Sequence, residues 1–118
     1  MDRITWSKTE KKIARQAFDT ALSREEASLL ADFKARAAAA ATQDDMWAVY
    51  RFLAERDGVM GRKYEFRYSE LISLFVLLRA EGWLDEADLA DLAGLRDDKL
   101  TMIREGCARW QRYFERDD

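Results

Sequence analysis

An uninterrupted run of helix-forming residues extends from Ser7 to Ala40, and it constrains the fold more than any other feature of the sequence. The run contains neither proline nor glycine, and its apolar residues recur mostly at intervals of three or four, as one face of a helix requires. Ser7 and Glu10 have the spacing of a capping box, in which each side chain bonds the backbone N–H of the other residue. We therefore predict a long first helix over about residues 7–41.

The length of this helix predicts that it does not stay within a lone globule. At 1.5 Å per residue it is ~50 Å long, whereas a compact domain of 118 residues has a diameter of roughly 35 Å. Either the helix breaks near Ser23, or its overhang packs on another chain. The alanines from Ala37 to Ala41 form a smooth surface that allows close helix approach, so we favour a second chain.

The rest of the chain, after Ala41, is also expected to be mostly helical, because the whole sequence has no proline and only 5 glycines to interrupt a helix. After Thr42, which can cap a helix, a second helix is predicted to end at Gly58 or, as the alternative, at Gly61. A basic and aromatic connector is expected over residues 62–68. The apolar residues that this second helix is expected to bury are Met46, Val49, Tyr50 and Leu53, with Trp47 on the flank.

Three further helices are predicted in the C-terminal half. The first begins at Tyr68 or Ser69, is apolar on nearly every side over residues 71–78, and stops at Gly82. A short helix is then predicted to begin at Leu84 or Asp85 and to end at Gly94, with the side chains of Leu89 and Leu92 facing the core. The last helix is expected from about Leu95 to about Phe114, with Gly106 permitting close contact. Its apolar seam would consist of Leu100, Ile103, Cys107, Trp110 and Phe114.

Composition excludes several classes of function. The net charge is −3 with acids and bases interleaved, which is not the footprint of a nucleic-acid-binding protein. The chain has no histidine and only one cysteine, Cys107, so we expect no internal disulfide, no metal site, no catalytic residues and no enzymatic activity. A lone cysteine and the lack of a signal peptide fit a reducing, cytoplasmic location. The longest apolar run is too short for a membrane span.

A set of short motifs, in order along the chain, resembles the fluorescence recovery protein family. The resemblance covers about Trp6 to Ile103, and no single motif is diagnostic. The matching motifs are Trp6-Ser7-x-x-Glu10, Asp44-Asp45-Met46-Trp47, Phe52-Leu53, Lys63-Tyr64, Arg67 with Ser69, Glu81-Gly82 and Asp98-Lys99.

The resemblance implies an all-α fold with a long N-terminal helix, a compact helical head at about residues 44–115, and an obligate-type homodimer. It implies one domain over residues 1–118 that has no cofactor and no enzymatic activity. It also implies binding to the orange carotenoid protein at its C-terminal domain. There the family accelerates the red-to-orange back-conversion, so that photoprotective quenching of the phycobilisome ends.

The chain departs from the family at its best-known functional cluster. Where the family has His, Asp and a later Arg on the second helix, this sequence has Tyr50, Arg51 and Asp57, so the acid and the base have exchanged places. Ser73 stands where the family usually presents a large apolar residue. The alternative is therefore a dimeric scaffold that serves another protein partner in a bacterium without phycobilisomes.

The residues expected at the dimer interface or at the partner-binding surface come from three of the predicted helices. Arg51 and Asp57 are too far apart to pair on one helix, so we expect them to pair between chains. Lys99 is included because it lies where the family places a basic residue. The full set is Met46, Trp47, Tyr50, Arg51, Leu53, Asp57, Ser73 and Lys99.

Overall fold

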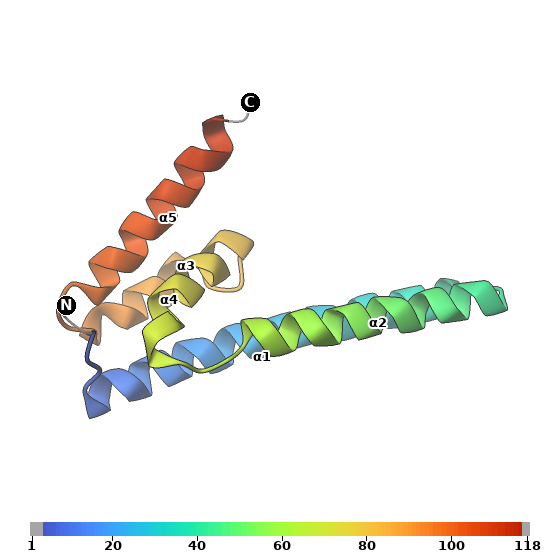
Figure 1. Ribbon diagram of the computed structural model, residues 1–118, viewed down its shortest axis with the longest axis horizontal. Coiled ribbons are helices and arrows are strands. Elements are labelled where there is room, and N and C mark those ends of the chain that lie inside the picture. The colour runs from blue at the N-terminus through green and yellow to red at the C-terminus, as the bar shows by residue number, and fades with distance from the viewer. Residues whose placement is uncertain (1–3, 117–118) are drawn as a thin grey trace. The chain divides into compact units, whose positions relative to one another are not determined.

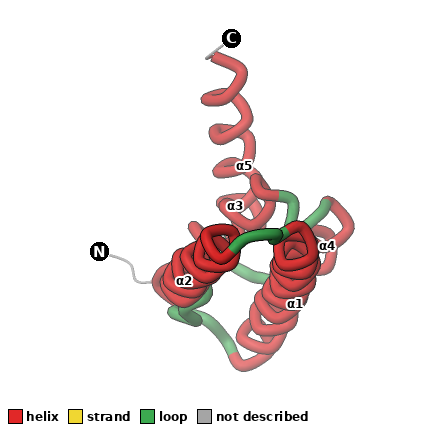
Figure 2. Tube along the Cα trace, turned by 90° about the vertical axis from the view of Figure 1, so that its right-hand side faces the viewer, coloured by secondary structure: helices red, strands yellow, loops and turns green. Residues whose placement is uncertain are grey.

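The computed structural model describes residues 4–116, which form helices joined by short loops and contain no strand (Figures 1 and 2). The predicted all-α fold is therefore confirmed. The elements are α1 (Lys8–Ala39), α2 (Gln43–Lys63), the 3-10 helix η1 (Tyr68–Glu70), α3 (Leu71–Glu81), α4 (Glu86–Ala90), the 3-10 helix η2 (Asp91–Gly94) and α5 (Lys99–Arg116).

The chain divides into two compact units, and α1 contributes to both of them. One unit combines the described residues up to Leu22 with those from Phe66 onward, and the other is Ser23–Glu65. The first unit thus holds the start of α1 with α3, α4 and α5, and the second holds the remainder of α1 with α2. The expectation of one domain over residues 1–118 stays a prediction.

The second unit is a hairpin of two helices, and Thr42 lies at the turn between them, where it caps the start of α2. The Thr42 hydroxyl accepts a hydrogen bond from the Asp45 N–H at 3.1 Å, and the Asp45 carboxylate accepts one from the Thr42 N–H, also at 3.1 Å. The Ala41 N–H donates to the same carboxylate at 2.9 Å. These bonds, that from Ala41 first, lower the pKa of Asp45 below its usual 3.8. The predicted cap at Thr42 is confirmed.

The end of the hairpin away from its turn is fixed by the buried carboxylate of Glu25 on α1. It accepts hydrogen bonds from the guanidinium of Arg56 at 3.1 Å, from the ammonium of Lys63 at 2.7 Å and from the hydroxyl of Tyr64 at 2.7 Å. Farther along, the Arg36 guanidinium lies 3.9 Å from the centre of the Phe52 ring. Both helices therefore run side by side, as Figure 1 shows.

These contacts explain why α2 is longer than the sequence predicts. The predicted end at Gly58 is wrong, and the alternative end at Gly61 is also too early, because α2 continues to Lys63. Neither glycine adopts the left-handed conformation that would stop a helix. Since Lys63 and Tyr64 both bond to Glu25, the tertiary contacts extend α2 past its glycines.

The first unit has its core between α3 and α5. Four residues of α3 are buried, as predicted for a helix that is apolar on nearly every side, and α3 stops at Gly82 with φ 87°. Gly106 of α5 lies so close to α3 that a Cβ atom there would be 2.5 Å from Cγ2 of Val76. The fully buried large side chains include Leu71, Phe75, Leu78, Leu84, Leu89, Leu92 and Ile103.

An aromatic cluster anchors the connector that precedes α3. The Phe66 ring packs edge-on against Phe18 at 5.1 Å and against Tyr68 at 5.2 Å, and the Arg15 guanidinium lies 4.7 Å from the Phe66 ring centre. The indole N–H of Trp6 donates to the backbone oxygen of Tyr68 at 3.2 Å. The connector is therefore a packed turn between helices.

The last helix begins later than predicted. It starts at Lys99 instead of about Leu95, because the backbone at Asp97 and Asp98 is left-handed, with φ of 56° and 61°. Aspartate tolerates this conformation better than most residues, since its short side chain can bond locally. The short helix before it agrees with the prediction: Asp85 caps α4, Leu89 and Leu92 are buried, and η2 ends at Gly94.

Candidate functional site

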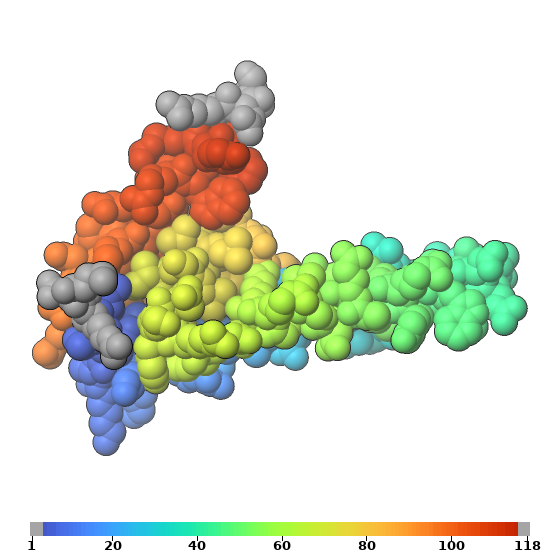
Figure 3. Space-filling view, in the orientation of Figure 1, coloured from blue at the N-terminus to red at the C-terminus, as the bar shows by residue number. Residues whose placement is uncertain are grey.

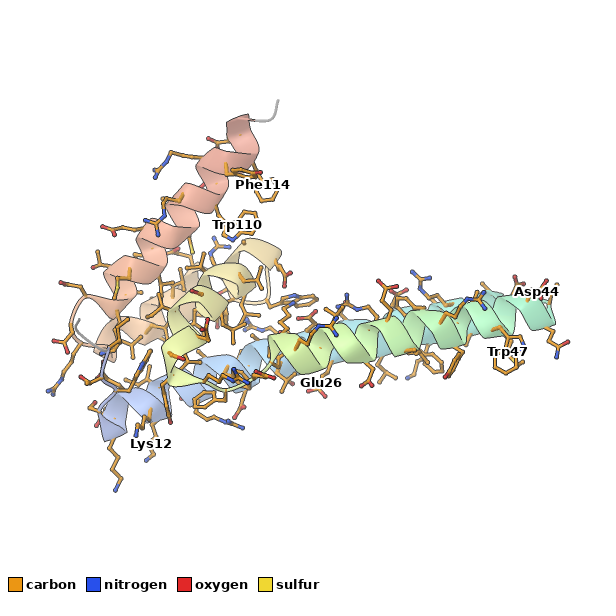
Figure 4. The ribbon with its side chains drawn as sticks, in the orientation of Figure 1. Lys12, Glu26, Asp44, Trp47, Trp110 and Phe114 are labelled. Carbon is orange, nitrogen blue, oxygen red and sulfur yellow. The ribbon has the colours of Figure 1, made fainter. Side chains whose placement is uncertain are left out.

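An exposed apolar surface on α2 is the main candidate site, and we call Met46, Trp47, Tyr50 and Leu53 the α2 surface. Met46, Trp47 and Tyr50 are 50%, 48% and 61% exposed, and Leu53 is half-buried. The prediction that α2 buries Met46, Val49, Tyr50 and Leu53 is therefore wrong for the single chain, since Met46 and Tyr50 are exposed and Val49 and Leu53 are only half-buried. The rings of Trp47 and Tyr50 meet edge to face at 5.9 Å, and Figure 4 shows Trp47 pointing away from the paired helices.

The exposure of the α2 surface follows from the two-helix architecture of its unit. A pair of helices can bury only the stripe on which they touch, and no residue of α2 is fully buried. Exposed aromatic and methionine side chains grouped on one helix are typical of protein contact surfaces. The α2 surface is therefore suited to binding another protein chain.

The exchanged charges flank this surface without contacting each other. Arg51 and Asp57 are both exposed, and within the part of the chain that the structure describes neither forms an ion pair. Six residues on an α-helix rotate by about 600°, so the two side chains leave α2 on different sides. Both charges are free to pair with another chain.

Ser73 lies in the other unit, beside a groove of about 610 Å³ between α3 and α5. Its side chain is exposed, and its neighbours Ile72 and Val76 are half-buried. Trp110 and Tyr113 of α5 line the same groove. A partner that reached Ser73 would therefore also meet apolar side chains.

Lys99 was expected to be a contact residue at the surface, but the structure shows that it is buried. Its side chain has 0% exposure, and its ammonium donates to the Glu10 carboxylate at 2.7 Å and to the backbone oxygen of Arg96 at 3.3 Å. The ammonium also lies 5.1 Å from the Trp6 ring centre. The expected contact at the surface is therefore wrong for Lys99.

The Glu10 carboxylate of this buried pair accepts hydrogen bonds from several donors. Besides Lys99, the Ser7 N–H donates to it at 2.9 Å and the Arg96 N–H at 2.8 Å. These hydrogen bonds, that from Lys99 first, lower the pKa of Glu10 from 4.5 to about 2. The pair therefore joins the start of α1 to the start of α5 and has a structural role.

The end of α5 presents aromatic side chains that the sequence pattern assigned to a buried seam. Ile103 is fully buried, but Phe114 is 58% exposed and Tyr113, outside the seam, is 63% exposed. Trp110 stacks on Phe114 with the ring centres 4.6 Å apart. Cys107, half-buried beside them, has its pKa raised by burial. Helical spacing alone could not show that α5 continues past the helices that would cover it.

The described residues contain no cluster of three or more His, Cys, Asp or Glu side chains placed to hold a metal ion. None of the helices in residues 4–116 is both long enough and apolar enough to cross a membrane.

Comparison with known proteins gives consistent matches over most of the chain. Residues 6–105 match the family described as photoprotection regulator fluorescence recovery protein. The fluorescence recovery protein of Synechocystis sp. is 33% identical over 98 residues, which cover 83% of this chain and 90% of that protein.

Solved structures of the same kind of protein superpose well on this chain. The fluorescence recovery protein of Fremyella diplosiphon has a TM-score of 0.78 and 34% identity, covering 89% of this chain and 99% of that one. The protein from Synechocystis sp. PCC 6803 has a TM-score of 0.78 and 31% identity, covering 88% and 99%. The chain therefore belongs to the photoprotection regulator fluorescence recovery protein family.

Proposed function

We propose that this chain is a protein-binding regulator without enzymatic activity that acts in the cytoplasm on the orange carotenoid protein. In this proposal it binds the C-terminal domain of that protein and accelerates the return from the light-activated red state to the resting orange state. The family membership supports the activity, and the exposed α2 surface is the observation that supports binding to another protein.

The proposed activity requires differential binding and no chemical step. A regulator shifts a conformational equilibrium only by as much as its affinities for the two conformers differ. It raises the rate of conversion when it binds the transition state between the conformers more tightly than the red state. Side chains that make apolar and charged contacts suffice for this, so we propose no cofactor.

We also propose that two copies of the chain form a homodimer through the α2 surface. Met46 and Leu53 would lie in the contact, because exposed apolar side chains gain free energy when a second copy covers them. Arg51 of one copy would pair with Asp57 of the other, since neither finds a partner among the described residues of its own chain. A double-mutant cycle on these two residues should give a coupling energy of ~0.5 kcal/mol or more for dimer dissociation.

A second candidate function rests on the exchanged charges and on Ser73. Any partner selected to meet an acid at position 51 and a base at position 57 would here meet Arg51 and Asp57, and like charges placed together lower affinity. Ser73 removes apolar area that would otherwise add to the contact. These changes favour a dimeric scaffold for a different protein partner.

Gel filtration with the purified orange carotenoid protein separates the two candidates. The first candidate predicts a complex with the photoactivated protein, weakened by Trp47→Ser because an aromatic anchor is lost. Leu30→Ser is the control, since Leu30 is 51% exposed on α1 outside the α2 surface. The absence of any complex would support the scaffold and contradict the first candidate.

A further inference from the structure

The last part of α5, residues 106–115, lies outside the region that matches the family, which ends at residue 105. Figure 3 shows this part of the chain, in red, with its side chains at the surface, and Figure 4 shows Trp110 and Phe114 on the same side of α5. Their rings stack almost parallel, with an angle of 4° between the planes and 4.6 Å between the ring centres. The part of α5 beyond the family match therefore presents a stacked aromatic pair.

The aromatic pair lines one side of a groove of about 670 Å³ within the first unit, which we call the α5 groove. Arg79 and Ala80 of α3 and Leu89 of α4 line it as well. Sites for small molecules are concave, have volumes of ~300–1,000 Å³, and combine mostly apolar walls with a few polar groups. The α5 groove has this size and this kind of lining.

The charged side chains of the α5 groove leave one cation without a partner. Arg104 forms an ion pair with Glu86, so these two charges offset each other. Glu115 follows Cys107 by eight residues, which places it ~12 Å farther along α5. Arg79 is half-buried, and no residue in the described part of the chain forms an ion pair with it. The groove thus holds a guanidinium that is partly removed from water and available to an anion.

The charge of Arg79 lies close to Cys107, which also lines the α5 groove. Burial raises the pKa of the Cys107 thiol, and the positive charge of Arg79 opposes this effect. Trp110 and Phe114 follow Cys107 by three and seven residues, so the three side chains share one face of α5. A molecule with an anionic group on Arg79 would therefore lay its apolar part on the aromatic pair.

We propose that the α5 groove binds a small aromatic carboxylate, held by its carboxylate on the Arg79 guanidinium and by its ring against Trp110 and Phe114. A guanidinium bonds a carboxylate through two parallel N–H donors, and aromatic rings attract each other in offset stacks. The negative charge of Glu115 at the far end disfavours a second carboxylate on the ligand. The α5 groove contains neither Ser73 nor any residue of the α2 surface, so this site does not depend on the proposed binding of the orange carotenoid protein.

Cys107, the only cysteine of the chain, lies in the α5 groove and reports on its occupancy. A bound molecule should slow the alkylation of this thiol by iodoacetamide, which mass spectrometry of the intact protein measures on the full-length chain. The probes are naphthoate and naphthamide, which share a ring system and differ in charge. We expect naphthoate to protect Cys107 at a concentration about tenfold lower than naphthamide does, because only naphthoate pairs a negative charge with Arg79.

Arg79→Gln should abolish this difference between the probes, each protein being compared with itself in the absence of a probe. Arg112→Gln is the matched control, because Arg112 is exposed on α5 and does not line the α5 groove. Phe114→Ser should weaken the protection by both probes, and circular dichroism would check that each variant keeps its fold. Equal protection by the two probes in the parent chain, or no protection by either, would overturn the proposal. The same loss in Arg112→Gln as in Arg79→Gln would also overturn it.

Discussion

Glu10 and Lys99 form a buried ion pair between residues that lie 89 positions apart in the sequence. Sequence spacing predicted one part of this arrangement, the capping box of Ser7 and Glu10, because that interaction is local. It could not predict the other part, since Lys99 meets Glu10 only when α1 and α5 are folded together. A lysine at a helix start looks solvated until its tertiary partner is known.

The substitution Glu10→Gln should lower the free energy of unfolding by up to ~3–5 kcal/mol, because it leaves the buried Lys99 ammonium with only the exposed carboxylate of Asp97, 4.0 Å away, as a counter-charge. Glutamine can still serve in a capping box, so the substitution removes mainly the charge. Denaturant titration measures the effect. Asp32→Asn, which breaks the exposed pair with Arg36, should cost under ~1 kcal/mol. A similar loss in both variants would contradict the role assigned to Glu10.

The lowered pKa of Glu10 predicts a loss of stability in acid. The Glu10 carboxylate takes up a proton near pH 4.5 in the unfolded chain but only near pH 2 in the folded chain. The ionised carboxylate therefore stabilises the folded state above pH 4.5, and this stabilisation is lost as the pH falls from 4.5 to about 2. Denaturant titrations of the parent chain and of Glu10→Gln between pH 6 and pH 2 should therefore converge at the acidic end. A constant difference in stability over that range would show that the Glu10 charge is not responsible.

At the scale of the elements, the sequence predicted helices well where local signals set their ends. The caps at Ser7, Thr42 and Asp85 and the stop at Gly82 all agree with the structure. Predictions failed where distant contacts decide, as at the end of α2, which Glu25 extends past two glycines. They also failed at the start of α5, where left-handed aspartates delay the helix.

The two helical glycines Gly106 and Gly61 provide a matched comparison. Alanine normally stabilises a helix by ~0.5–1 kcal/mol relative to glycine. Gly61→Ala should do so, since no atom lies within 4 Å of the added Cβ. Gly106→Ala should instead destabilise the protein by ~1–3 kcal/mol, because its Cβ would lie 2.5 Å from the stiff Val76 side chain. Thermal unfolding that shows equal shifts for both variants would contradict the close packing of α3 on α5.

Over the chain as a whole, the sequence identified the apolar face of α2 but could not show that a single chain leaves this face exposed. Met46, Trp47 and Tyr50 were expected to be apolar contact residues, and the structure leaves them uncovered within one chain. Periodicity identifies an apolar face, but it cannot say whether the same chain or another one covers it. The end of α5 illustrates the same limit, since Phe114 has the spacing of a buried seam and is nevertheless 58% exposed.

The proposed dimer makes Met46→Glu a direct test. A carboxylate placed in an apolar contact loses hydration without gaining a partner, so the dimer should dissociate at least about tenfold more readily. Light scattering at tens of micromolar should give about twice 13.8 kDa or more for the parent chain and a lower mass for the variant. A monomeric parent chain would exclude the dimer, and an unchanged mass for the variant would remove Met46 from the contact.

The proposed regulatory activity can be measured as the rate at which photoactivated orange carotenoid protein loses its red absorbance in the dark. We expect substoichiometric amounts of this protein to accelerate the loss of red absorbance, and we expect Trp47→Ser, but not Leu30→Ser, to reduce the acceleration. An unchanged rate at a saturating concentration of the parent chain would show that it does not regulate the orange carotenoid protein.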